Sequence, residues 1–434
     1  MKLKWKKVLS VAILPVLMLS LAGCGGANTD SSASTAKQVT IHVACQEHPD
    51  VDALKELLPS FEKQYGVKVD LNVLPQQQLN TKVEIALASN SSDYDVIMMD
   101  DMQTAQYAKA GWIVPLDTFI NNTSLTNKSK FNESDFLKGF LKVLAVNGTQ
   151  YALPFYGEST MLFYNKEMFS KAGISAPPQN MQELEADAAK LTGNGVYGIA
   201  LRGSRDINWY PWAGFLFAFG GHWLDANGKP TLNSPAAVQA TQLYGKLISK
   251  YGPPGGASFD WNQVQLSMQQ GKAAMIIDAS NFGPRLEDPK ESKIVGKVGF
   301  AMVPAGPAGR FPSVYTAGLA IPKGSKHQAD AWKFIEWATS KQTQLESAMK
   351  VSRADVTRQS VWEDPAYTQK YNNKDMMQIA VKSMNLANPD YLPRIPQFNK
   401  LSSIVGIAVS KVIAGTNAQT AMNQAQDAAI QLFK

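Results

Sequence analysis

The chain has 434 residues, more than one hydrophobic core usually organises, so two domains of ordinary size are expected. Its apolar fraction of 45% and charged fraction of 18% are those of a globular protein. The formal charge of +6 suggests an anionic partner, but residues 1–23 carry four lysines and no acidic residue, and without them the charge is +2. Because the basic bias is largely confined to this leader, nucleic acid is not expected as a partner.

The leader, residues 1–23, predicts an export signal. Basic residues precede an apolar run that is too short to span a bilayer comfortably, and the run ends in small residues. A transmembrane anchor is the alternative, but Pro15 and the short run argue against it. The break L-A-G-C at residues 21–24 resembles the bacterial lipobox, in which the cysteine is lipidated and becomes the mature N-terminus. Residues 24–37 then predict a flexible tether.

Cys24 and Cys45 are the two cysteines of the chain. If Cys24 carries lipid, Cys45 has no partner, so neither a disulfide nor a cysteine-based metal site is expected. Cys45 lies in the apolar stretch 39–45 and is expected to be a buried strand thiol.

Strand and helix patterns alternate at the start of the mature chain. Strands are predicted at 39–45, 67–74 and 94–99, with helices at 51–65 and near 79–88 between them. This alternation indicates β-α-β units and a mostly parallel sheet.

Polar residues follow the first and third of these predicted strands. Because ligands gather at the carboxyl ends of parallel strands, Glu47, His48, Asp100 and Asp101 lie where a ligand would be met. Exposed loop charges and helix caps explain each single residue at least as well.

The stretch Y-A-L-P-F-Y-G-E at 151–158 brings Tyr156, Gly157 and Glu158 together among apolar neighbours. An isolated buried carboxylate is costly, so Glu158 must be solvated, paired or facing a group that hydrogen-bonds to it. Gly157 would allow backbone adjustment or the close approach of a ligand.

The rest of the chain continues the α/β pattern and shows no fixed-period repeat. Further elements are predicted as strands at 197–202, 271–278, 298–304 and 314–322 and as helices near 181–191, at 329–349 and from 374 to the end. The pattern indicates two α/β lobes, with the chain crossing between them more than once.

Catalytic and metal-binding signatures fail on their context. Residues 193–198 match G-x-G-x-x-G, but a helix precedes and a strand follows, the reverse of a dinucleotide site. The turn at 225–228 resembles a calcium loop, yet its twelfth position is Ala236. The four histidines lack metal-ligand spacing, so neither a metal ion nor a cofactor is expected. Paired carboxylates for glycoside hydrolysis stay open, because their spacing is spatial.

Aromatic residues cluster where strand ends and loops are expected. They are Trp209, Tyr210, Trp212, Trp223, Trp261 and Tyr315. Sugars and sugar alcohols have apolar C–H faces and polar edges, so their sites combine aromatic platforms with a few charged or amide groups. Hydrophobic packing explains any one of these aromatics as readily, and the neighbouring Arg202 and Asp278 favour a binding site.

Several segments together resemble the extracellular solute-binding proteins, family 1, of ABC importers. They are the lipobox, Y-A-L-P-F-Y-G-E-S-T-M-L-F-Y-N-K-E-M-F-S-K-A-G, Y-G-P-P-G-G, F-D-W-N-Q-V-Q-L-S-M-Q-Q-G-K-A-A-M-I-I-D and K-V-G-F-A-M-V-P. L-P-F-Y-G-E-S, I-A-L-R-G and Y-G-P-P-G are most similar to the sorbitol-, mannitol- and arabitol-binding branch. Residues 204–210 depart from that branch by lacking its Gly-rich stretch, and residues 314–318 replace a more Trp-rich one.

The resemblance implies the type II fold of periplasmic binding proteins. This is an α/β fold of two lobes with mostly parallel sheets flanked by helices and a ligand cleft between the lobes. Lobe 1 would comprise residues 38–156 and 318–355, and lobe 2 residues 157–317 and 356–434.

The resemblance also implies a function. The protein would be a monomeric lipoprotein, held by Cys24 on the outer face of the cytoplasmic membrane. It would capture a sugar alcohol or a sugar by closing its lobes and deliver it to the permease subunits of an ABC importer. A secreted carbohydrate-active enzyme and a surface scaffold are the alternatives.

Site residues follow from matching positions in that family. Glu158 would sit where the first crossover meets the cleft. Asp278, Glu158 and Arg202 are expected to recognise hydroxyls, and Trp209 and Trp261 to stack on the ligand. The full predicted set is Glu47, His48, Asp100, Asp101, Tyr156, Glu158, Arg202, Asn208, Trp209, Tyr210, Trp223, Trp261, Asp278, Asn281 and Tyr315.

Overall fold

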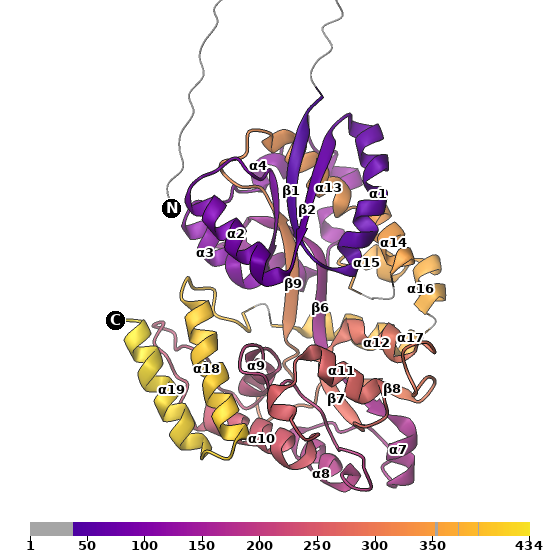
Figure 1. The fold of residues 1–434 in the computed structure, drawn as a ribbon, viewed down its shortest axis with the longest axis vertical. Coiled ribbons are helices and arrows are strands. Elements are labelled where there is room, and N and C mark those ends of the chain that lie inside the picture. The colour runs from indigo at the N-terminus through magenta and orange to yellow at the C-terminus, as the bar shows by residue number, and fades with distance from the viewer. Residues whose placement is uncertain (1–37, 352–354, 372, 389) are drawn as a thin grey trace, which may run out of the picture. The chain divides into compact units, whose positions relative to one another are not determined.

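The computed structural model describes residues 38–351, 355–371, 373–388 and 390–434 (Figure 1). The predicted export signal, the Cys24 lipidation site and the tether lie outside these residues. Residues 38–434 cluster as one compact unit. Within the described ranges, no helix combines the length and the apolar composition that a bilayer crossing needs.

A seven-stranded sheet runs in the order β2-β1-β3-β9-β6-β7, with β8 also paired to β6. Its strands are β1 (Thr40–Gln46), β2 (Lys68–Leu74), β3 (Val96–Asp100), β6 (Ala152–Asn165), β7 (Met275–Ala279), β8 (Val298–Ala301) and β9 (Val314–Ala320). A separate hairpin joins β4 (Ala145–Val146) to β5 (Thr149–Gln150).

The prediction of a mostly parallel sheet is wrong beyond the first three strands. β1 pairs in parallel with β2 and β3, as the β-α-β pattern predicts. β9 pairs antiparallel with β3 and β6, and β6 pairs antiparallel with β7 and β8. The reason is that β6 and β9 carry the chain in opposite directions, side by side, between two groups of elements (Figure 1). The predicted strand at 197–202 forms isolated bridges, including Tyr197 with Ala273.

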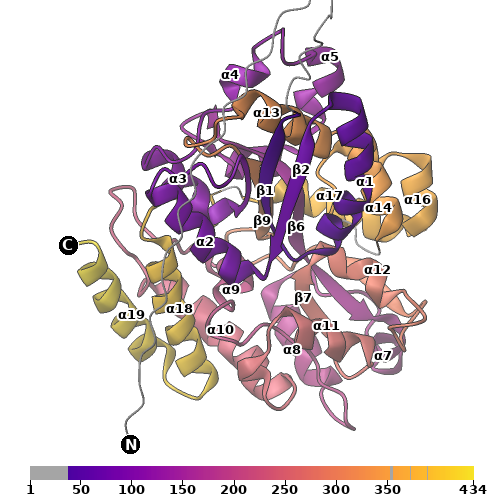
Figure 2. The same ribbon diagram turned by 45° about the horizontal axis from the view of Figure 1, so that its top comes forward.

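The first group surrounds β1, β2 and β3. Its helices are α1 (Pro49–Tyr65), α2 (Gln76–Ala88), α3 (Thr104–Lys109), α4 (Asp117–Ile120), α5 (Lys128–Phe131), α6 (Lys138–Val143), α13 (Gln328–Ala338) and α14 (Lys341–Lys350). The N-terminus of α1 is capped by His48, whose ring accepts a bond from the Asp50 N–H, and Gly66 ends the helix at φ 67°. Helices α13 and α14 pack against α1, although they come much later in the chain (Figure 2).

The second group surrounds β7 and β8. Its helices are α7 (Lys166–Lys171), α8 (Met181–Leu191), α9 (Trp209–Ala218), α10 (Pro235–Tyr251), α11 (Trp261–Gln269), α12 (Gly283–Leu286), α18 (Phe398–Ile413) and α19 (Ala418–Leu432). Helix α10 is central, because α8, α9, α18 and α19 all pack against it. Helix α9 is buried along nearly its whole length, as its apolar sequence W-Y-P-W-A-G-F-L-F-A predicts.

The C-terminal boundary between the groups differs from the predicted one. The family resemblance predicts that residues 356–434 belong to lobe 2. In the structure, α15 (Gln359–Trp362) and α16 (Pro365–Tyr371) pack against α14 of the first group. The Lys370 ammonium donates to the Ala348 carbonyl at 2.7 Å, which ties α16 to the end of α14. Helix α17 (Lys374–Leu386) then contacts β6 and β8.

Candidate ligand-binding site

The crossing strands place polar side chains near the end of β3. In the β6–β9 register, Gly157 faces Thr316 and Glu158 faces Tyr315, while Asp100 of β3 faces Ala317. The 3-10 turn Ser280–Phe282 follows β7 and brings Asn281 to the same region. The candidate site is therefore assembled from segments that lie far apart in the sequence.

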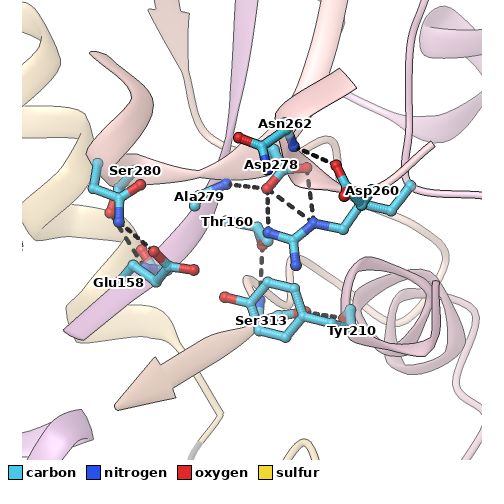
Figure 3. A network of polar contacts seen from close by, with 12 residues as sticks. Glu158, Thr160, Tyr210, Asp260, Asn262, Asp278, Ala279, Ser280 and Ser313 are labelled. Atoms are coloured by element: carbon cyan, nitrogen blue, oxygen red, sulfur yellow. Dashed lines mark hydrogen bonds and ion pairs between the residues drawn. The ribbon is translucent and has the colours of Figure 1, made fainter. Parts of the chain in front are cut away.

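Arg202 and Asp278 form a buried ion pair in this region. Figure 3 shows Asp278 with Glu158 and Tyr210 in the surrounding network of polar contacts. Arg202 Nε donates to Asp278 Oδ2 at 3.0 Å, and the second guanidinium nitrogen donates to Oδ1. Asp278 is fully buried, and the guanidinium lies 4.8 Å from the centroid of the Tyr210 ring. Burial opposes the charge of Arg202, but Asp278 and Glu158 outweigh it and raise the arginine pKa.

Glu158 is buried and accepts a hydrogen bond from the Asn281 side-chain amide. The same amide nitrogen lies 3.3 Å from Asp355 Oδ2, and Asn281 Oδ1 has no partner among the described residues. The carboxylate at the end of the apolar stretch 151–158 is thus paired, and it also lies close enough to Tyr210 and Arg202 to affect their pKa values.

Two tyrosine hydroxyls at the site are buried without a hydrogen-bond partner in the described part of the chain: those of Tyr210 and Tyr391. Their rings meet edge to face, with centroids 5.8 Å apart. Burial raises the pKa of both hydroxyls, and the negative charge of Glu158 raises them further. Each unpaired buried hydroxyl costs about 1–3 kcal/mol, so a partner supplied by a ligand or by water would stabilise both groups.

Two further polar atoms near the end of β3 are buried without a partner among the described residues. Asp101 Oδ1 and Thr316 Oγ1 are buried and have no partner among the residues that the structure describes. An ionised Asp101 would raise the pKa of the Tyr210 and Tyr391 hydroxyls, so its carboxyl lies close to both of them. The site therefore offers acceptors, donors and aromatic faces together, the combination that suits a ligand with several hydroxyl groups.

The Tyr315 hydroxyl links Asp100 to Tyr156 beside the site. The Tyr315 hydroxyl donates to Asp100 Oδ1 at 2.6 Å and lies 3.5 Å from the Tyr156 hydroxyl. Gln46 donates to that Tyr156 hydroxyl. The ring of His48 stacks on Tyr156 at 3.9 Å, which links the N-terminus of α1 to β6.

Three residues predicted to contact a ligand form hydrogen bonds inside the protein. Asn208 is fully buried and its amide nitrogen donates to the Gly406 carbonyl at 3.1 Å, while its Oδ1 has no partner among the described residues. The Trp209 indole donates to the Asp206 carbonyl at 2.8 Å, and that of Trp223 donates to the Tyr391 carbonyl at 2.9 Å. The Trp209 ring also meets the Phe398 ring edge to face, and its stacking on a ligand stays a prediction.

The remaining predicted residues lie nearer the surface. Glu47 is exposed. Trp261 begins α11 with 37% of its surface exposed, and its ring lies 6.5 Å from that of Phe282. Stacking of Trp261 on a ligand stays a prediction.

The structure gives a packing reason for a glycine at position 157, which the sequence did not reveal. A Cβ atom at this position would lie 2.7 Å from the Phe140 ring. The glycine therefore makes room for Phe140 of α6, and the close approach of a ligand at this position stays a prediction.

His48, Asp50 and Asp355 are the described residues that could gather around a metal ion, with one donor atom of each within 4.8 Å of the others. His48 Nδ1 lies 3.1 Å from Asp50, and Nε2 lies 3.9 Å from Asp355. The two carboxylates hold the imidazole between them, so these contacts also fit a purely structural histidine.

Tyr391 is the site residue that the sequence reasoning missed. It lies between α17 and α18 in a stretch, N-P-D-Y-L-P, that predicts only a turn. Its bond with Trp223 and its contact with Tyr210 come from packing between distant segments. An aromatic residue inside a turn-rich stretch was the one available signal.

Crossing strands between two α/β groups, with polar groups gathered beside them, define a two-lobe solute-binding protein of type II. Residues 47–345 match the family of bacterial extracellular solute-binding proteins, and the chain belongs to this family.

Individual members of the family are similar over most of the chain. The mannitol-binding protein of Pseudomonas aeruginosa is 28% identical over 414 residues, which cover 90% of this chain and 92% of that protein. The ribitol complex of an ABC transporter solute-binding protein from Agrobacterium radiobacter is 30% identical with a TM-score of 0.81, covering 91% of this chain and 99% of that one. The maltose-bound MalE3 of T. maritima is 26% identical with a TM-score of 0.78, covering 91% and 100%.

Proposed function

We propose that this protein captures a sugar alcohol and delivers it to the membrane permease of an ABC importer. The observation that carries the proposal is the set of buried, unpaired polar atoms of Tyr210, Tyr391 and Asp101 beside the Arg202–Asp278 pair. A polyol has a hydroxyl on each carbon, so one ligand can satisfy several of these atoms at once. The mannitol- and ribitol-binding relatives support the same ligand class.

In this proposal each polar group has a role in recognition. Glu158 and Asp278 accept hydrogen bonds from ligand hydroxyls, and Arg202 donates. The hydroxyls of Tyr210 and Tyr391 gain the partners that they lack among the described residues. The two groups of elements serve as lobes, and the ligand favours the closed arrangement through contacts that only this arrangement offers.

A mono- or oligosaccharide is the second candidate ligand, because the maltose-bound relative shares the fold and sugars present the same hydroxyl chemistry. Binding without turnover is proposed for either ligand class. A secreted carbohydrate-active enzyme would convert more than one equivalent of ligand during a long incubation, and chromatography of the incubated ligand distinguishes the two.

Mannitol, sorbitol, arabitol and ribitol are expected to raise the melting temperature of the protein. A ligand that binds only the folded state adds RT ln(1 + [L]/Kd) to its stability, which is about 2.7 kcal/mol when the ligand is at 100 times Kd. A thermal-shift panel of polyols and sugars measures this directly. Stabilisation by maltose or xylose but by none of the polyols would contradict the polyol assignment.

Anchoring through Cys24 is the second part of the proposed function. The lipobox-like break predicts that the mature protein begins at Cys24 and carries acyl chains that hold it at the membrane. Intact mass of the membrane-extracted protein is expected to exceed the mass of residues 24–434 by the acyl chains. The Cys24→Ser variant is expected to leave the membrane fraction, and its retention there would contradict the anchor.

A further inference from the structure

Asp100 and Asp101 are consecutive residues at the end of β3, and both side chains are buried, with exposures of 4% and 6%. Two neighbouring carboxylates away from water cannot both ionise without a large free-energy cost. The hydrogen bonds around each residue indicate which of the two carries the charge.

Asp100 receives the hydrogen-bond donors. The Tyr315 hydroxyl donates to Oδ1 at 2.6 Å, Gln76 donates to Oδ2 at 3.0 Å, and Asn80 donates to Oδ2 at 3.4 Å. Burial raises the pKa of Asp100, but these donors stabilise its ionised form and offset part of that increase. The negative charge of the pair therefore belongs on Asp100.

The Asp101 carboxyl has different hydrogen-bond partners from that of Asp100. Backbone N–H groups of Met102 and Thr316 bond to its carboxyl and lower its pKa, but burial is the larger effect, and Oδ1 has no partner in the described part of the chain. Burial raises the Asp101 pKa well above its ordinary value, and the charge of Asp100 raises it further.

The groups facing Asp101 do not cancel this effect. Arg394 lowers the Asp101 pKa from a distance, but its guanidinium also donates to the Ala145 carbonyl at 2.8 Å and lies 3.3 Å from Asp390. The hydroxyls of Tyr210 and Tyr391, which lie close to Asp101, are uncharged, and the charged groups beside those hydroxyls are Glu158 and the Arg202–Asp278 pair.

We propose that Asp101 meets the ligand as a neutral carboxylic acid and donates its proton in a hydrogen bond to a ligand hydroxyl oxygen. The inference rests on the proposed function for the identity of that ligand. Glu158 and Asp278 can only accept hydrogen bonds, whereas every ligand hydroxyl must also find donors for its oxygen. A neutral Asp101 supplies a hydrogen-bond donor, whereas an ionised Asp101 would add another acceptor. The site therefore favours ligands with uncharged hydroxyl groups, and their binding requires a protonated Asp101.

The ligand-free protein tests the protonation state. A folded-state pKa above the unfolded value of about 3.9 means that the folded protein holds the proton longer, so stability falls as pH rises between the two values. The melting temperature of wild type is expected to fall relative to that of Asp101→Asn as pH rises above about 4. The exposed Asp93→Asn is the matched control and is expected to follow wild type. A constant difference between wild type and Asp101→Asn from about pH 4 to 9 would overturn the neutral state.

Calorimetric titration with mannitol tests the donor role. The Kd of wild type is expected to rise by up to about tenfold per pH unit once Asp101 ionises, and that of Asp101→Asn to stay independent of pH. A pH-independent Kd of wild type through the range in which Asp101 ionises would overturn the donor role. If no polyol binds wild type at any pH, the proposed function fails, while the ligand-free melting curves still decide whether Asp101 is neutral.

Discussion

Replacing Arg202 with leucine is expected to lower the free energy of unfolding of the ligand-free protein by about 3–5 kcal/mol. Asp278, its partner, is fully buried, so the variant leaves a carboxylate without a counter-ion inside the protein. The guanidinium also covers the Tyr210 ring, and this contact is lost with it. Urea unfolding followed by circular dichroism measures the change.

The matched control is Arg285→Leu. Arg285 pairs with Glu291 at 2.7 Å, but about a third of each side chain is exposed, and surface pairs of this kind contribute about 0–1 kcal/mol. A second comparison replaces both Arg202 and Asp278 with leucine, which is expected to recover much of the loss because the buried Asp278 carboxylate is removed together with its partner. If Arg202→Leu costs no more than Arg285→Leu, the Arg202–Asp278 pair does not stabilise the fold as argued.

Local patterns predicted the first group of elements well, because its structure follows from neighbouring residues. The alternation around β1, β2 and β3 indicates parallel pairing, and these strands do pair so. The direction of β6 and β9 depends on where the chain returns after more than a hundred residues, and no local pattern encodes that. The packing of α16 on α14 is non-local in the same way, and for this reason the predicted lobe boundary was early.

Residues of the candidate site were predictable where a polar side chain lies in an apolar strand or at the end of a strand, because both its type and its position then indicate a binding site. Glu158, Arg202, Asp278 and Asn281 are polar residues in apolar strands or at strand ends, and the structure brings them together. Their contact with a ligand stays a prediction.

The aromatic residues were harder to assign from sequence. Trp209 belongs to a helix that is apolar on all sides, and that pattern favours burial over ligand stacking. Tyr391 was missed because its neighbours in the site come from α9 and from the end of β3, far away in the sequence.

Removing the two unpaired hydroxyls, with Tyr210→Phe and Tyr391→Phe combined, is expected to weaken polyol binding by about 2–4 kcal/mol, or roughly 30- to 900-fold in Kd. Each hydroxyl lacks a partner among the described residues, so we expect it to form a hydrogen bond with the proposed ligand. Without that ligand the hydroxyls are a cost, and the free energy of unfolding of the ligand-free variant is expected to stay the same or rise. Isothermal titration and urea unfolding of the same preparation give both values.

Tyr244→Phe separates this expectation from a general effect of losing a buried hydroxyl. The Tyr244 hydroxyl donates to the Arg202 carbonyl at 2.7 Å, so its removal leaves an internal acceptor unpaired and is expected to lower stability by about 1 kcal/mol. The two variants are thus expected to differ in their free energy of unfolding. Tyr244→Phe lowers it, and the Tyr210 and Tyr391 variant does not. A stability loss of similar size in both variants, with polyol affinity retained in the double variant, would show that Tyr210 and Tyr391 serve the fold. In that event the candidate site would reduce to Glu158, Arg202 and Asp278, because the unpaired hydroxyls are what distinguish a ligand site from a buried ion pair.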